Sequence, residues 1–230
     1  RDHAVAHTNK SGTLALDYAS KQGQQFIIKA KPSTYHINLG GNIWNFYAKG
    51  GDCKSIGAWD DAAKTCKLNQ DALQTIAIED DGITLDGNSK SVVDTKSGDG
   101  VYADASNVVI ENIRVNNFDR GIVISSSLRN NSPIGGTIKD SVVENTLSQI
   151  VINNVDNVIL NNVTTNGGTT GIRLSNQSGT QIFNSAVNGA STGLFFDNSG
   201  NAAIFQTDFL TNTTGITGTM TLTPVVTGTT

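Results

Sequence analysis

The chain has 230 residues, of which 37% are hydrophobic and only 16% are charged, and its formal net charge is −4. Soluble domains usually have roughly 25% charged residues, so uncharged polar residues and glycine occupy an unusually large share of this sequence. The acidic balance excludes a strongly basic nucleic-acid-binding protein, and no apolar run reaches the ~18 residues of a membrane span. The composition favours many short strands joined by tight turns over helices.

The first 74 residues contain no repeat. A short helix is expected over Leu14 to Gln22, and strands are expected over residues 26–30 and 35–39, on either side of Pro32. We expect residues 1–74 to be an arm and a cap that covers the first strands of the structure that follows. A cap is needed there because a bare strand edge attracts other chains.

The two cysteines, Cys53 and Cys66, lie thirteen positions apart. This spacing is neither that of a C-x-x-C redox motif nor that of a metal site with two cysteine pairs. A structural disulfide that closes a short loop is therefore expected, and no metal site is expected. A disulfide indicates an oxidising compartment, so the expected location is extracellular or at the cell surface.

A repeat dominates the sequence from about residue 107 onward. Segments that begin at Asn107, Gly135, Asn157, Gly179 and Asn201 follow one another at spacings of 28, 22, 22 and 22 residues. The fourth and sixteenth residues of every segment are aliphatic, and four of the five fifteenth residues are glycine. The six extra residues of the first segment lie near Leu128 to Pro133. The sixth-position row is Asn112, Asp140, Asn162, Asn184 and Gln206, and a further row contains Asn154, Asn176 and Asn198.

A period of 22 residues is too short for a helix-pair repeat and too long for a hexapeptide solenoid. It suits an all-β fold, the right-handed parallel β-helix, in which each coil has three short strands and three turns. Stacked coils place equivalent residues ~4.8 Å apart, so the aliphatic rows form a continuous core and the asparagine rows can hydrogen-bond along the stack. The glycine row provides either a positive φ or a close backbone approach. About six to seven coils are expected over residues 75–218, followed by a strand or tail at 219–230.

Residues 50–218 resemble secreted right-handed β-helix proteins of the NosD-like, pectin-lyase-like superfamily. The segments that carry the resemblance are Trp59 to Cys66, Thr75 to Ile78 and Asp81 to Asn88, together with later repeats of the form Gly-Ile-x-Leu-Ser-Asn. The resemblance implies a parallel β-helix. It implies no single activity, because the superfamily includes lyases, hydrolases, epimerases and adhesins.

A pectate-lyase-like enzyme needs carboxylates that hold Ca²⁺ and an arginine or lysine base. When the coils are placed in register, Asp99 lies directly below Arg120, with Asp119 one residue earlier, and these three are the one acid–base cluster that we can assemble. A surface ion pair is the simpler interpretation of this cluster. Residues 157–230 carry only three charged residues, which provide no acid–base pair. The chain is therefore expected to be non-catalytic and to need no cofactor, with Ca²⁺ required only in the lyase alternative.

The expected function is structural: a secreted or cell-surface β-solenoid whose copies associate head to tail into a filament or surface layer. A surface of low charge opposes such association only weakly. Surface polysaccharide is a further expected partner, and the alternatives are a polysaccharide lyase or epimerase and a carbohydrate-binding or adhesive module. The C-terminal tail could also fold over its own last coil. The expected assembly residues are Leu14, Leu16 and Tyr18 near one end and Met220, Leu222, Val225 and Val226 near the other.

Overall fold

The computed structural model of the chain contains two compact units, residues 1–41 and 42–230. In the first unit, β1 (Val5–Thr8) pairs antiparallel with β2 (Leu14–Asp17). The helix expected over Leu14 to Gln22 is wrong, because its first four residues form β2, and the strands expected at 26–30 and 35–39 lie outside the described residues. The structure describes residues 5–8, 14–17, 43–47, 49–94, 98–126, 134–221 and 223–229.

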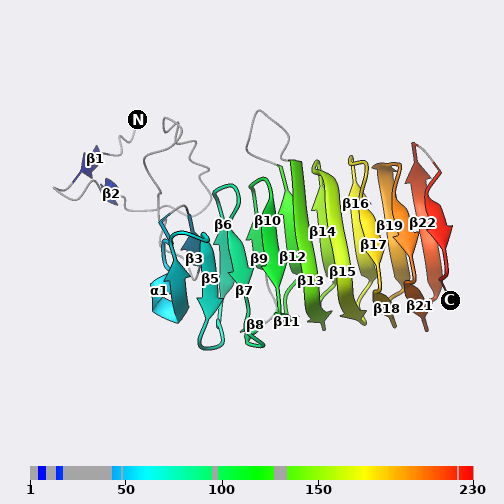
Figure 1. Ribbon diagram of the computed structural model, residues 1–230, viewed down its shortest axis with the longest axis horizontal. Coiled ribbons are helices and arrows are strands. Elements are labelled where there is room, and N and C mark those ends of the chain that lie inside the picture. Colours follow the sequence, from blue (N-terminus) through cyan, green and yellow to red (C-terminus); the bar gives the residue numbers. More distant parts are fainter. Residues whose placement is uncertain are drawn as a thin grey trace. The chain divides into compact units, whose positions relative to one another are not determined.

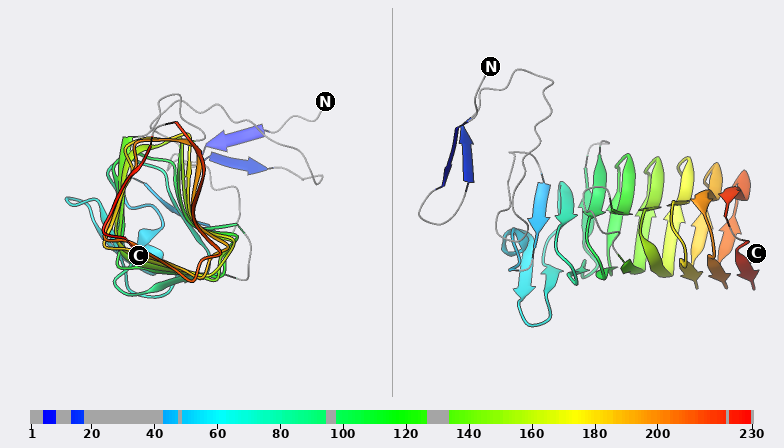
Figure 2. Two further views of the ribbon diagram at one scale, coloured as in Figure 1. Left: turned by 90° about the vertical axis from the view of Figure 1, so that its right-hand side faces the viewer. Right: turned by 90° about the horizontal axis from the view of Figure 1, so that it is seen from above.

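The second unit is a parallel β-solenoid whose coils are stacked side by side (Figure 1), which confirms the fold class predicted from the sequence. Seen along the stack, successive coils superpose, so that each wall of the solenoid is a sheet built from one strand per coil (Figure 2). One wall is an eight-stranded sheet, and its outer surface is called the groove face below. Its strands are β3 (Ile43–Phe46), β6 (Thr75–Ile78), β9 (Asp99–Ala103), β12 (Arg120–Ser125), β14 (Ser148–Asn153), β16 (Thr170–Ser175), β19 (Thr192–Ser199) and β22 (Thr214–Met220).

The other two walls belong to one 13-stranded sheet, because β13 (Ile134–Glu144) and β15 (Asp156–Asn166) continue around the corner between them. The second wall also contains β4 (Gly57–Asp60), β5 (Thr65–Leu68), β7 (Thr84–Asp86), β10 (Val108–Glu111), β17 (Gln181–Phe183), β20 (Ala203–Phe205) and β23 (Val225–Thr227). The third wall also contains β8 (Ser91–Val93), β11 (Arg114–Asn116), β18 (Ala186–Asn188) and β21 (Asp208–Leu210).

The strand register follows the sequence repeat. Eight residues separate Ser125 from Ile134, whereas two separate Asn153 from Asp156 in the next coil, so the six extra residues lie between β12 and β13. The aliphatic rows form inward-facing columns that are almost entirely buried, and burying each such side chain contributes ~1.5–3 kcal/mol. One inward-facing column of the eight-stranded sheet is Phe46, Ile78, Ala103, Ile124, Ile152, Leu174, Phe196 and Gly218.

The asparagine rows lie at the corners of the coils, where the backbone turns through the left-handed region. Asparagine and aspartate tolerate this conformation better than most residues, and every residue of the first- and sixth-position rows has a positive φ. Some neighbours also bond along the stack: Asn162 Nδ2 donates to Asp140 Oδ1 at 2.7 Å, and Asn198 Nδ2 donates to Asn176 Oδ1 at 2.9 Å. The rows are therefore explained mainly by the backbone conformation at the turns, and the side-chain hydrogen bonds are a secondary contribution.

The glycine row serves close packing rather than a positive φ. A Cβ atom built on Gly171 would lie 2.4 Å from Val187 Cγ1 and 2.7 Å from the carbonyl oxygen of Gly193. The φ angles of Gly121, Gly171 and Gly193 are not in the left-handed region. Of the two reasons that the sequence offers for this row, the structure selects the close approach of the backbone to the next coil.

Replacing Gly171 by alanine is therefore expected to lower the free energy of unfolding by ~1–3 kcal/mol, the usual loss on overpacking a core. The matched control is Gly215→Ala in the last coil of the same row, where a Cβ atom meets nothing within 4 Å. This control is expected to change stability by less than about 1 kcal/mol, because alanine also restricts the unfolded chain. Guanidinium unfolding followed by circular dichroism measures both, and equal losses would contradict the packing explanation.

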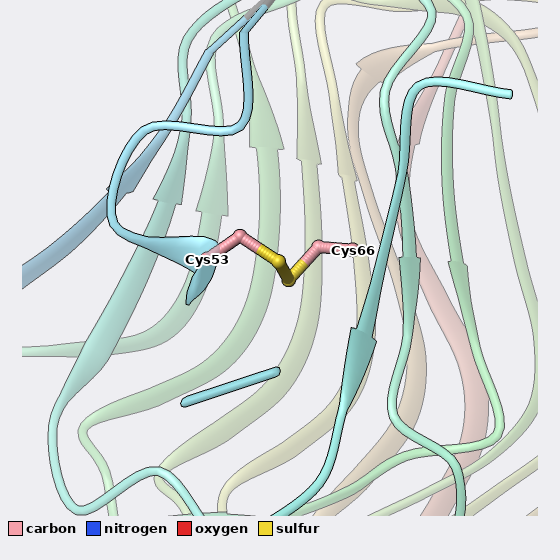
Figure 3. The surroundings of a disulfide bond; sticks show 2 residues. All are labelled: Cys53 and Cys66. Atoms are coloured by element: carbon pink, nitrogen blue, oxygen red, sulfur yellow. A yellow bond between two sulfur atoms is a disulfide. The ribbon is translucent and has the colours of Figure 1, made fainter. Parts of the chain in front are cut away.

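A disulfide fixes the first helix at the N-terminal end of the coil stack. The disulfide between Cys53 and Cys66 joins the short helix α1 (Cys53–Ile56) to β5 (Figure 3). Cys66 is paired in register with Leu85 and so begins the fourth-position aliphatic column. Both cysteines and Ile56 are buried. The disulfide thus anchors α1 over the first coil.

The C-terminal tail adds to the solenoid of its own chain. Strand β23 pairs in parallel with β20, which is the alternative in which the tail folds onto its own last coil. Leu222 lies outside the described residues, as does Tyr18, and the side chains of Leu14 and Leu16 are not described. No helix among the described residues is long and apolar enough to cross a membrane.

Candidate functional site

A shallow groove of about 250 Å³ crosses the groove face between β12 and β19. Side chains alternate along a strand, so the residues between the inward columns face outward here. Val123 and Val151 form the floor of the groove, where they are 1% and 7% exposed. Polar side chains from neighbouring coils line its sides.

An ion pair marks one end of the groove. Arg120 on β12 is in register with Asp99 on β9, and its Nε and Nη2 atoms donate to the two carboxylate oxygens at 2.6 and 2.8 Å. Asp119 takes another partner, because its Oδ2 accepts a hydrogen bond from the backbone N–H of Gly98 at 3.2 Å. The structure therefore brings together Asp99 and Arg120 of the predicted cluster as a bidentate pair. In this arrangement Arg120 is a cation that already faces a carboxylate, which is unlike a free general base.

A second ion pair marks the other end of the groove. Arg173 Nη2 donates to Asp197 Oδ2 at 2.5 Å, and Arg173 Nε donates to Ser175 Oγ at 3.0 Å. The guanidinium also lies over the ring of Phe195, 5.5 Å from its centroid, a cation–π contact that holds it against the sheet. The sequence-based prediction contained no acid–base pair in this part of the chain. The 22-residue repeat contains the signal for this pair. It places Asp197 beside Ser175, and Arg173 is two residues before Ser175 and so lies on the same face of the sheet.

Ion pairs also link neighbouring coils on the other two walls. Arg114 Nη1 lies 2.6 Å from Glu144 Oε1, and Lys139 Nζ lies 2.7 Å from Glu111 Oε2. The hydrogen bond and the negative charge of Glu111 raise the pKa of Lys139 above its usual value. These exposed pairs contribute little stability individually, and they lie outside the groove.

Residues 64–222 match the protein-family model described as periplasmic copper-binding protein (NosD). No curated protein and no solved structure matches the chain significantly. The family match spans β5 to the end of β22 and so covers most of the solenoid.

The described residues do not fit a copper site. Copper is bound in proteins by cysteine, methionine and histidine side chains. Both cysteines form the disulfide, His3 and His36 lie outside the described residues, and the side chain of His7 is not described. Met220 is thus the one free side chain of these three kinds among the described side chains. In the part of the chain that the structure describes, no three His, Cys, Asp or Glu side chains form a metal-binding group.

The family match, which covers more than half of the chain, and the stacked parallel coils together show that this protein belongs to the NosD family.

Proposed function

We propose that this NosD-family protein is a non-catalytic structural component of the cell envelope whose copies associate through the C-terminal end of the coil stack. The disulfide supports a location outside the cytoplasm, as does the description of the family as periplasmic. The C-terminal coil, defined as residues 201–229, carries the association in this proposal. Association of copies head to tail into a filament, which the sequence suggests, is one form of this proposal.

The observation that carries the proposal is the exposed apolar surface of the C-terminal coil. The column that begins at the buried Cys66 ends at Val226, which is 40% exposed. Leu210, Met220 and Val225 are 47%, 41% and 55% exposed in the same coil. Strands β22 and β23 have no neighbour on their outer sides among the described residues, and such edges recruit further strands.

The charge of the C-terminal coil also favours contact between copies. Asp208 is the one charged residue in positions 201–229, so two such surfaces repel each other weakly. Burying exposed aliphatic side chains in the contact gains ~25 cal/mol per Å² of apolar area. Together these features describe a surface suited to a second copy of the chain.

The N-terminal edge of the groove-face sheet, at β3, already has hydrogen-bond partners within the chain. The backbone N–H of Asn45 donates to Asp52 Oδ2 at 3.0 Å, and its carbonyl oxygen accepts the N–H of Asp52 at 2.9 Å. The outer edge of β3 is thereby blocked for strand pairing. A head-to-tail filament must place the C-terminal coil against an end at which the β3 edge is blocked, whereas two C-terminal coils can pair with each other in a closed two-fold dimer.

The double variant Val225→Lys, Val226→Lys tests the proposal. At high concentration the unmodified chain is expected to show the mass of a dimer or a filament by light scattering, and the variant the mass of a monomer, because buried lysines repel across the contact. The control is Thr169→Lys, Gln181→Lys, which adds the same charge at exposed positions in the middle of the stack and is expected to leave the mass unchanged.

A strictly monomeric unmodified chain would overturn the association, and so would undiminished assembly of the Val225→Lys, Val226→Lys variant. The non-catalytic part is checked with pectate and alginate in the presence of Ca²⁺. A rise in absorbance from unsaturated products that disappears in Asp119→Asn and Arg120→Ala would show that the protein is a lyase.

A further inference from the structure

The eight-stranded sheet has two end strands, β3 and β22, at opposite ends of the coil stack (Figure 1). Neighbouring strands of this sheet are parallel throughout. A second copy stacked end to end therefore continues the sheet if its β3 pairs with β22 of the first copy. The end strand β4 of the 13-stranded sheet is antiparallel to β5, so its edge does not continue a parallel register. Head-to-tail stacking thus depends on the outer edge of β3.

One residue blocks this edge. The carbonyl oxygen of Phe46 accepts the N–H of Glu79 on the β6 side, so the backbone groups of Asn45, one residue earlier, point to the outer side. Asp52 takes both of them, with its carboxylate on the N–H and its own N–H on the carbonyl oxygen. Ile43, at the start of the strand, is 43% exposed. The strand therefore has an exposed apolar side chain beside an edge that one residue occupies.

The disulfide holds Asp52 in this position. Asp52 directly precedes Cys53, the first residue of α1. Helix α1 has only four residues, and a single helical turn is not stable without tertiary contacts. Its buried anchors are the disulfide from Cys53 to Cys66 on β5 and the side chain of Ile56. Opening the disulfide removes one of these two anchors and frees Asp52 to leave Asn45.

We propose that the disulfide between Cys53 and Cys66 selects the form of self-association. In the oxidised chain Asp52 blocks β3, and two C-terminal coils pair in a closed dimer. In the dithiol chain β3 is open and pairs with β22 of a second copy. Such contacts repeat without closing, so the product is a filament. This inference rests on the proposed function, because the C-terminal coil is the partner surface in both forms.

The chemical step is a two-electron reduction. A dithiol such as dithiothreitol gives two electrons and two protons to the S–S bond, which becomes two thiols, while the reductant becomes a cyclic disulfide. Both cysteines are completely buried, so reduction proceeds through local opening of α1. A newly exported chain is in the dithiol state until the bond forms, and oxidation then closes the β3 edge.

The first test compares the full chain with and without dithiothreitol, together with the variant Cys53→Ala, Cys66→Ala, by light scattering and negative-stain electron microscopy. The oxidised chain is expected to reach the mass of a dimer and to stay there as concentration rises. The reduced chain and the variant are expected to form filaments whose mass keeps rising with concentration. Dithiothreitol is expected to leave the variant unchanged, which controls for other effects of the reductant.

The second test opens the edge with the disulfide intact. Asp52→Ala removes the acceptor of the Asn45 N–H, so this amide is expected to exchange about tenfold faster, the effect of one lost hydrogen bond. The oxidised variant is expected to form filaments at concentrations where the unmodified chain is a dimer. Asp52→Asn is the matched control, because its side-chain oxygen still accepts the N–H, and it is expected to remain dimeric.

The outcomes separate this inference from the proposed function. A reduced chain that keeps the mass of the oxidised dimer would overturn the redox control and leave the association intact. Filaments that persist when Val225→Lys, Val226→Lys is added to the cysteine variant would also overturn it, because their contact would not use the C-terminal coil. A chain that is monomeric in both redox states would overturn the proposed function as well.

Discussion

Replacing Phe196 by alanine is expected to lower the free energy of unfolding by ~3–5 kcal/mol, the usual loss for truncating a buried aromatic side chain. Phe196 is completely buried and lies in an inward-facing column between Leu174 and Gly218. Gly218 has no side chain, so Phe196 is the last residue that fills this column. Its removal leaves a cavity that neither neighbour can fill. Guanidinium unfolding followed by circular dichroism measures the loss.

Phe205→Ala is the matched control for this prediction. Phe205 lies on β20, where it is 38% exposed, so its truncation removes less buried area and is expected to lower stability by roughly 1–2 kcal/mol. If the two variants lost the same stability, the inward columns would not be the main source of stability in the solenoid.

Removing the disulfide is expected to lower the free energy of unfolding by ~3 kcal/mol, because the bond restricts the unfolded chain over a closed loop of this length. The two cysteines are thirteen residues apart in sequence and both are completely buried. The double variant Cys53→Ala, Cys66→Ala removes the bond without leaving buried thiols. The loss is expected to be local, because each coil is stabilised by its direct neighbours.

Hydrogen exchange locates this effect. In the double variant, α1, β4 and β5 are expected to lose protection first, while β12 to β16 in the middle of the stack keep it. Reduction of the unmodified chain is expected to give the same pattern and to leave the variant unchanged, which provides the control. Free thiols that titrate in the native, unreduced protein, or a uniform loss of protection in all coils, would contradict the prediction.

Much of the solenoid could be predicted from the sequence alone. Each coil contacts the next in the same way, so the same side chain is required at the same position of every coil, and a row such as Ile122, Ile150 and Ile172 appears directly in the sequence. The pairing of Arg120 with Asp99 follows from the same register. The disulfide was also predictable, since the chain has only two cysteines.

Only the tertiary structure decided the features that have no equivalent in neighbouring coils. Residues 14–17 form a strand rather than a helix because they pair with β1, a contact that no repeat reveals. Asp52 blocks the edge of β3 through its two hydrogen bonds with Asn45, which no repeated position predicts. The burial of Val123 and Val151 in the floor of the groove is likewise set by tertiary packing. Repetition makes the core of each coil and the pairs between aligned positions readable from sequence, whereas the two ends of the chain depend on single contacts, which a repeat does not encode.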